Sequence, residues 1–187
     1  GFVEDTQDIA VTVTAVNEAP AFSGLGGSVS HTEGGSATVL AGAATLSDPE
    51  LSAANSFDGA TLTLARSSGA NADDIFSATG RLATLTAGQN LVLDGAVVGT
   101  VSANGGGTLG LSFNASATQA RIDEVLRSIA YANSADAPPA SVQIRWTFSD
   151  GNTGGQGTGS ALTAVGTTTV NITAVNDPAV IGGAIHV

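Results

Sequence analysis

Acidic side chains stand at several turns of this sequence in combinations that suit a divalent cation. The stretch LSDPE holds Asp48 and Glu50 two residues apart, beside a proline that stiffens the turn. The stretch FSDG contains Asp150, and HTEGG places Glu33 next to glycines, which let another backbone approach closely. Ca²⁺ takes about six to eight oxygen ligands from carboxylates, amides and backbone carbonyls. These turns therefore supply candidate calcium ligands.

Asparagine and an acid stand together in a phrase that the chain carries twice. VTAVNEAP holds Asn17 and Glu18, and ITAVNDPA near the other end holds Asn176 and Asp177. In each phrase an alternation of apolar and polar residues, typical of a strand, leads into asparagine, an acid and then proline. Proline ends the strand because it cannot donate to the ladder. We interpret the phrases as two module junctions, and a chance match is the alternative.

The two junctions predict how the chain is divided. Residues 18–175 are expected to be one complete module. Residues 1–17 would then be the last strand and linker of a preceding module, and residues 176–187 the linker and first strand of a following one. Repetition of this kind is typical of a tandem array, so the expected partners are neighbouring repeats of the same chain.

The charge balance excludes several classes of partner. Sixteen acidic residues face five basic ones, a net charge of −11, and neither nucleic acid nor an anionic membrane surface binds such a chain without a basic patch. The charge favours cations, although acidity that only keeps a protein soluble would look the same. No apolar run reaches the roughly 18 residues of a membrane span. The absence of cysteine excludes disulfides and thiol catalysis.

Catalysis has little support in the sequence. His31 and His186 are far apart, and we find no nucleophile elbow, HExxH motif or phosphate-binding glycine loop. We therefore predict that the protein is not an enzyme. One remote alternative stays open, a calcium-triggered autocleavage at the bonds between Asp48 and Pro49 or between Asp177 and Pro178.

Strand patterns dominate between the junctions. Residues 142–148 alternate apolar and polar side chains and point Trp146 into the core, and residues 61–66 alternate in the same way. Asp94 and Gly95 between two apolar runs predict a hairpin.

One segment, residues 117–129, has helical periodicity instead, and Ser116 with Gln119 predicts a capping box at its start. The expected fold is all-β, a Greek-key β-sandwich with one short helical connection.

Several stretches resemble the cadherin-like repeats of large bacterial surface adhesins and type I secreted, RTX-type proteins. The resemblance rests on TEGG, SDPE, the helical stretch ATQARIDEVLRSIAYANSAD, FSDG and the two terminal phrases, and it covers nearly the whole chain. It implies a cadherin-like or immunoglobulin-like sandwich, stiffened by Ca²⁺ and repeated along an extended extracellular protein. Such proteins act in cell adhesion and biofilms at the bacterial surface.

The resemblance also implies which residues hold the calcium ions at the two junctions. The first site would combine the incoming linker with acids of the module: Asn17, Glu18, Asp48, Glu50 and Asp150. The second, at the opposite end, would use Glu33, Asn176 and Asp177. The linker is reduced to one asparagine and one acid, so we expect fewer ions per junction than the family's full linker holds. Other acids are expected to be solvated turn residues: Asp58, Asp73, Asp74, Asp94 and Asp136.

Two functions fit these features. The first is a calcium-binding spacer module whose ions rigidify the array. The second is an adhesin module that binds a glycan or a host or matrix surface, or associates with a second copy, through the loops at residues 67–74 and 151–166. The single tryptophan and the single tyrosine are both placed for the core and not for a sugar platform. That placement favours the spacer, and we expect the isolated module to be monomeric.

Overall fold

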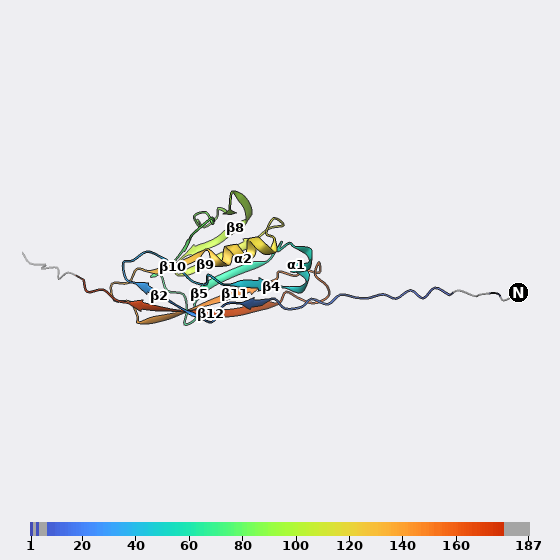
Figure 1. The fold of residues 1–187 in the computed structure, drawn as a ribbon, viewed down its shortest axis with the longest axis horizontal. Coiled ribbons are helices and arrows are strands. Elements are labelled where there is room, and N and C mark those ends of the chain that lie inside the picture. Colours follow the sequence, from blue (N-terminus) through green and yellow to red (C-terminus); the bar gives the residue numbers. More distant parts are fainter. Residues whose placement is uncertain (2, 4–6, 178–187) are drawn as a thin grey trace, which may run out of the picture.

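The computed structural model describes residues 1, 3 and 7–177, which form a body of strands with two short helices (Figure 1). Strands take up 42% of the chain and helices 9%, so the prediction of a β-dominated fold is confirmed. In chain order the elements are β1 (Ala21–Ser23), β2 (Ser28–Thr32), β3 (Thr38–Val39), β4 (Thr45–Ser47), α1 (Pro49–Ala54), β5 (Thr61–Arg66), β6 (Asp74–Ala78), β7 (Asn90–Leu93), β8 (Ala96–Gly105), β9 (Thr108–Phe113), α2 (Gln119–Arg127), β10 (Ile129–Asn133), β11 (Ser141–Ser149) and β12 (Thr163–Thr173).

Seven strands form one mixed sheet in the order β2-β12-β11-β5-β9-β8-β7. Neighbouring strands are antiparallel except β2 and β12, which run parallel. The hairpin predicted at Asp94 and Gly95 joins β7 to β8, and both residues have positive φ angles, 52° and 77°. Two smaller sheets, β1-β4 and β3-β10-β6, accompany the large one.

The core lies between the large sheet and the smaller elements. Burial alternates along β11 as the sequence predicts, and Trp146 and Phe148 are fully buried. Phe22 of β1 meets both rings edge-on, with 6.5 Å between ring centroids in each pair. The β1-β4 sheet therefore packs on the inner face of β11, and α2 adds three buried aliphatic side chains to the same core.

The helices differ from the prediction in number and in capping. The prediction of one helical connection is wrong, because the described residues contain two helices; α1 has six residues, too few for a helical periodicity to show. The capping box from Ser116 is also wrong: the N-cap of α2 is Thr118, and its side chain makes no capping hydrogen bond. Gln119 Nε2 instead donates to the carbonyl of Leu46 on β4, at 2.6 Å. Within the described residues, neither helix has the length and apolar character needed to cross a membrane.

The incoming chain extends away from the end of the body that carries α1 (Figure 1). Residues 7–15 have no regular secondary structure. Val11 and Val13 are 78% and 87% exposed, whereas the residues that align with them in the second phrase, Val170 and Ile172 of β12, are buried. The predicted strand has no sheet to join here, so its assignment to a preceding module stays a prediction.

The outgoing chain leaves at the opposite end of the body (Figure 1). It follows directly from β12, the longest strand, which runs toward that end. The boundaries predicted for the module, residues 18–175, stay a prediction. The strand predicted within residues 176–187 falls mostly on residues 178–187, which lie outside the described residues.

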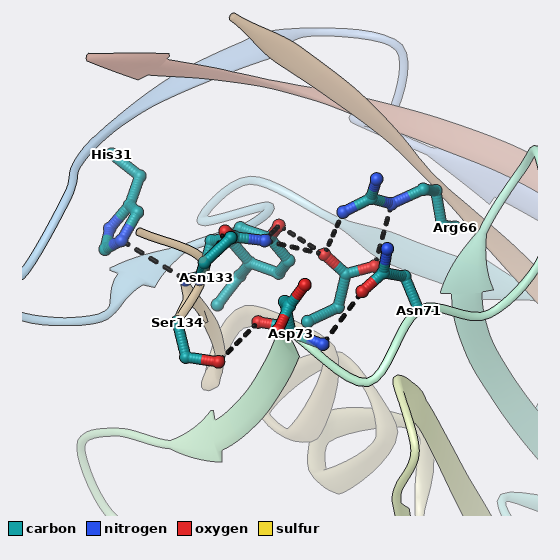
Figure 2. Close-up of polar contacts among 9 residues, drawn as sticks. His31, Arg66, Asn71, Asp73, Asn133 and Ser134 are labelled. Atoms are coloured by element: carbon teal, nitrogen blue, oxygen red, sulfur yellow. Dashed lines mark hydrogen bonds and ion pairs between the residues drawn. The ribbon is translucent and has the colours of Figure 1, made fainter. Parts of the chain in front are cut away.

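A buried ion pair takes the place of the solvated turn expected at Asp74, which is 3% exposed at the start of β6. Arg66 of β5 donates Nε and Nη2 to its two carboxylate oxygens, at 2.9 and 2.6 Å. Tyr131 Oη at 2.6 Å and Asn133 Nδ2 at 3.1 Å donate to the same carboxylate, and Figure 2 shows these groups converging. The prediction of a solvated Asp74 is therefore wrong, because these donors replace the water that an isolated carboxylate would need.

His31 lies at the edge of this network. It is 1% exposed on β2, and its Nε2 accepts the backbone N–H of Asn133 on β10 at 3.3 Å (Figure 2). Its ring also meets Tyr131 edge-on at 6.1 Å. Burial, and next the hydrogen bond to Asp74, raise the pKa of Tyr131 well above its ordinary value, so the tyrosine stays a donor. The network thus joins β2, β5, β6 and β10.

Candidate metal centre

The loop between β11 and β12 holds the incoming linker against the body. The backbone N–H of Asn17 donates to the carbonyl of Thr158 at 3.0 Å, and the N–H of Thr158 donates to the carbonyl of Ala15 at 2.9 Å. Gly157 is needed for this approach, because its φ is 126° and a β-carbon there would lie 2.9 Å from the Ala15 carbonyl. The linker is therefore fixed at the residue that carries the first candidate ligand.

Asn17 points its side chain into the body and is only 6% exposed. Its Nδ2 donates to Asp150 Oδ2 at 2.8 Å and to the carbonyl of Ser160 at 3.1 Å. Its Oδ1 is buried and has no hydrogen-bond partner. An amide oxygen that has lost water without gaining a donor costs free energy, and it is also an oxygen ligand of the kind that Ca²⁺ takes.

Asp150 is fully buried and organises the loop as well as the linker. Its Oδ1 accepts the backbone N–H groups of Asn152 and Leu162, both at 3.0 Å. Its Oδ2 accepts Asn17 and a second contact from Leu162, at 3.1 Å. The carboxylate thereby joins the two ends of the loop to the incoming linker.

Asp48 has one structural oxygen and one unpartnered oxygen. As N-cap of α1, its Oδ1 accepts the backbone N–H of Leu51 at 2.8 Å and of Glu50 at 3.1 Å. Its Oδ2 is buried without a partner, and so is Oε2 of Glu50. Asp48 could therefore cap α1 and bind an ion at the same time, because the two roles use different oxygens.

The carboxylates at this end repel one another. A hydrogen bond with the Glu50 carboxyl, followed by the charges of Glu50 and Asp48, raises the pKa of Glu18, which is exposed. Burial raises the pKa of Asp48, and the charges of Glu50 and Asp150 add to the rise against two backbone hydrogen bonds that oppose it. Glu18, Glu50, Asp48 and Asp150 thus influence one another electrostatically, and Asn17 is hydrogen-bonded to Asp150. This cluster of acids would gain stability from a positive charge.

The raised pKa values predict how the ion-free protein responds to pH. Folding favours the protonated forms of Glu18 and Asp48, so their contribution to stability is present below the ordinary values of 4.5 and 3.8 and is lost as the pH rises through the higher folded values. In EDTA, we expect the melting temperature to rise as the pH falls from 7 toward 4.5, and to rise more in the wild type than in Glu50→Gln, which removes the principal neighbour of Glu18. Equal pH responses in thermal melts of the two proteins would contradict this.

Glu33 lies beside the outgoing linker. Its backbone N–H donates to Thr173 at 3.0 Å, and its Oε2 accepts the backbone N–H of Val175 at 2.8 Å. Asn176 and Asp177 follow directly and are exposed. The structure brings Glu33 to the outgoing linker, but the described contacts do not join it to the two linker side chains.

No group of three or more His, Cys, Asp or Glu side chains in residues 1, 3 and 7–177 is already gathered as a metal site. The cluster at the incoming linker is of another composition. One of its oxygens belongs to the amide of Asn17, and two of its acids, Glu18 and Glu50, interact with each other. The buried oxygens of Asn17 and Asp48 that have no hydrogen-bond partner favour a ligand at this position, because desolvation without a partner is unfavourable.

Two polar groups near the incoming linker were not predicted from the sequence. Ser160 supplies a carbonyl, and Gln156 has a buried Oε1 without a partner beside a pocket of about 240 Å³ that Glu50 also lines. Backbone carbonyls carry no residue-type signal, so the carbonyl of Ser160 could not be found from the sequence.

Comparison with known protein families, curated proteins and solved structures finds no match to this chain. A function for this chain therefore has to rest on its own residues and their geometry.

Proposed function

We propose that this chain is a calcium-binding spacer module of a tandem array, with Ca²⁺ held where the incoming linker meets the body. The observation that carries the proposal is the set of buried oxygens without partners on Asn17, Asp48 and Glu50, in a cluster of acids that repel one another. A bound cation would supply the missing partner and reverse the repulsion.

The residues of this cluster would have different roles in holding the ion and the linker. Asn17 and Asp150 hold the linker at the loop, and Asp48 holds the start of α1 with Oδ1 while Oδ2 remains for the ion. Glu18 and Glu50 would close over the ion from the linker side and the body side. An ion bound by both sides limits the rotation of the linker relative to the body, and summed over many junctions this would stiffen a long array.

Support for the array comes from the exposed aliphatic side chains of the incoming chain. Val11 and Val13 occupy the places that Val170 and Ile172 fill in β12, yet they are exposed. Burying each in a preceding module would contribute about 1.5–3 kcal/mol. The opposite exits of the incoming and outgoing chains suit an extended string of modules (Figure 1).

The finer features of the fold and location belong to the same proposal. We infer a cadherin-like Greek-key sandwich, in which the first strand region contributes β1 to one layer and β2 to the other. The array would be extracellular, at a bacterial surface, and the isolated module monomeric. Within the described residues the inner face of the large sheet is already covered by the smaller elements, which accords with a monomer.

Calcium is expected to raise the melting temperature of this chain. For a dissociation constant of ~10⁻³ M, ~5 mM Ca²⁺ would stabilise the fold by about 1 kcal/mol per site, or roughly 2–4 °C for a domain of this size. Thermal melts in EDTA, Ca²⁺ and Mg²⁺ measure the effect, and isothermal titration calorimetry gives the stoichiometry. We expect little response to Mg²⁺, which dehydrates reluctantly. No heat and no shift with Ca²⁺ would rule out the proposal.

A further inference from the structure

Tension applied along the chain would enter and leave at opposite ends of this module. The incoming linker joins the body beside α1 and leads through β1 to β2, while the outgoing linker follows β12 at the other end (Figure 1). A pull on the two linkers would therefore draw β2 toward the first end and β12 toward the second. The response to force depends on how these two strands are connected.

The two strands are adjacent and parallel over five residue pairs, from Ser28 with Thr169 to Thr32 with Thr173. Hydrogen bonds extend the pairing at both ends: Thr169 N–H donates to Gly27 at 3.0 Å, and Glu33 N–H donates to Thr173 at 3.0 Å. Parallel strands pulled from their opposite ends slide past each other. In that direction all the bonds resist together, whereas strands pulled apart from one end break their bonds one at a time.

We propose that β2 and β12 form a force-resisting clamp, which unfolds under tension along the linkers only when their whole parallel ladder shears. The core side of the ladder adds resistance, because His31, Val170 and Ile172 are buried there. The three-residue β1-β4 pairing precedes the clamp in the path of the force. The clamp goes beyond the calcium proposal and needs no ion, so measurements in EDTA test it independently.

The chain has no cysteine, so pairs of introduced cysteines can attach handles for single-molecule pulling at chosen points. Handles at Ala19→Cys and Ala174→Cys load the β2-β12 ladder in shear, and the first lies beyond the contacts of the incoming linker with the loop. Handles at Ser36→Cys and Ala174→Cys load the same ladder from one end, because residue 36 follows β2 at the end where β12 finishes. We expect the first pair to require the higher unfolding force at the same loading rate. Equal forces, or a higher force for the second pair, would overturn the clamp.

Two proline substitutions on β2 test the ladder itself. N–H groups alternate along a strand, so the N–H of Val29 faces β12 as that of Glu33 does, while the N–H of Ser30 faces away. Between the Ala19 and Ala174 handles, Val29→Pro should unfold about tenfold faster than wild type at constant load, and Ser30→Pro should remain close to wild type. Equal acceleration by both prolines would contradict the clamp. Should Val29→Pro fail to fold, the comparison of handle positions in the wild type decides alone.

Discussion

Asp74→Asn is expected to lower the free energy of unfolding by about 3–5 kcal/mol, the usual cost of breaking a buried ion pair from one side. The amide keeps the shape but loses the charge that Arg66 faces, and the Arg66 side chain is only 14% exposed. Whichever way the amide turns, its NH₂ group meets a donor: Arg66 Nε at the position of Oδ2, or Tyr131 and Asn133 at the position of Oδ1. For a domain of this size the loss corresponds to roughly 6–20 °C in melting temperature.

Asp73→Asn is the matched control for this loss. Asp73 is the preceding residue and has the same chemistry, but only its backbone carbonyl takes part in the contacts near Ser134 (Figure 2). We expect it to stay within about 0.5 kcal/mol of wild type. Urea denaturation followed by circular dichroism measures all three proteins, and a small effect of Asp74→Asn would show that the network contributes little to stability.

Asp48→Asn is expected to abolish most of the stabilisation by Ca²⁺ while leaving the ion-free protein folded. The amide oxygen can still cap α1 through the backbone N–H groups of Glu50 and Leu51. The substitution removes the negative charge and replaces Oδ2, the oxygen without a partner to which the ion would bind, by an NH₂ group. The shift of roughly 2–4 °C expected at ~5 mM Ca²⁺ should therefore fall close to zero.

Asp136→Asn removes an acid from the exposed loop after β10 and controls for the general loss of negative charge. It should keep the full calcium shift. Melting curves of the three proteins with Ca²⁺ and with EDTA make the comparison. An undiminished shift in Asp48→Asn, or an equal loss in Asp136→Asn, would remove Asp48 from the site.

The strands could be predicted from the sequence wherever both the alternation and the turn are local. The β7-β8 hairpin follows from Asp94 and Gly95, and β11 follows from its alternating side chains, because neither depends on a distant partner. The parallel pairing of β2 with β12 could not be deduced in this way. It joins segments from the two ends of the module, and its register is set by packing in the folded core.

The acidic residues likewise differ in how far the sequence indicates their role. Turns marked Asp48, Glu50 and Asp150 as candidate ligands, but only the family resemblance grouped them with the incoming linker, and their role as ligands stays a prediction. Asp74 carries no such local mark, because its partner Arg66 lies on β5 of the large sheet while Asp74 lies on β6 of a smaller sheet, and only the fold brings the two side chains together. An aspartate followed by proline is a local signal for the start of a helix, but α1 is too short to show helical periodicity beside it, so the capping role of Asp48 was not predicted.

The incoming chain also affects how this protein would behave at high concentration. The backbone groups of residues 7–14 lack ladder partners, and three aliphatic side chains alternate along this stretch in the open: Ile9, Val11 and Val13. An extended apolar segment without a sheet is a template for pairing with other chains and a seed for aggregation. Two acids close to it, Asp8 and Glu18, oppose such pairing through like-charge repulsion. Solubility of the isolated chain should thus be sensitive to salt, which screens that repulsion.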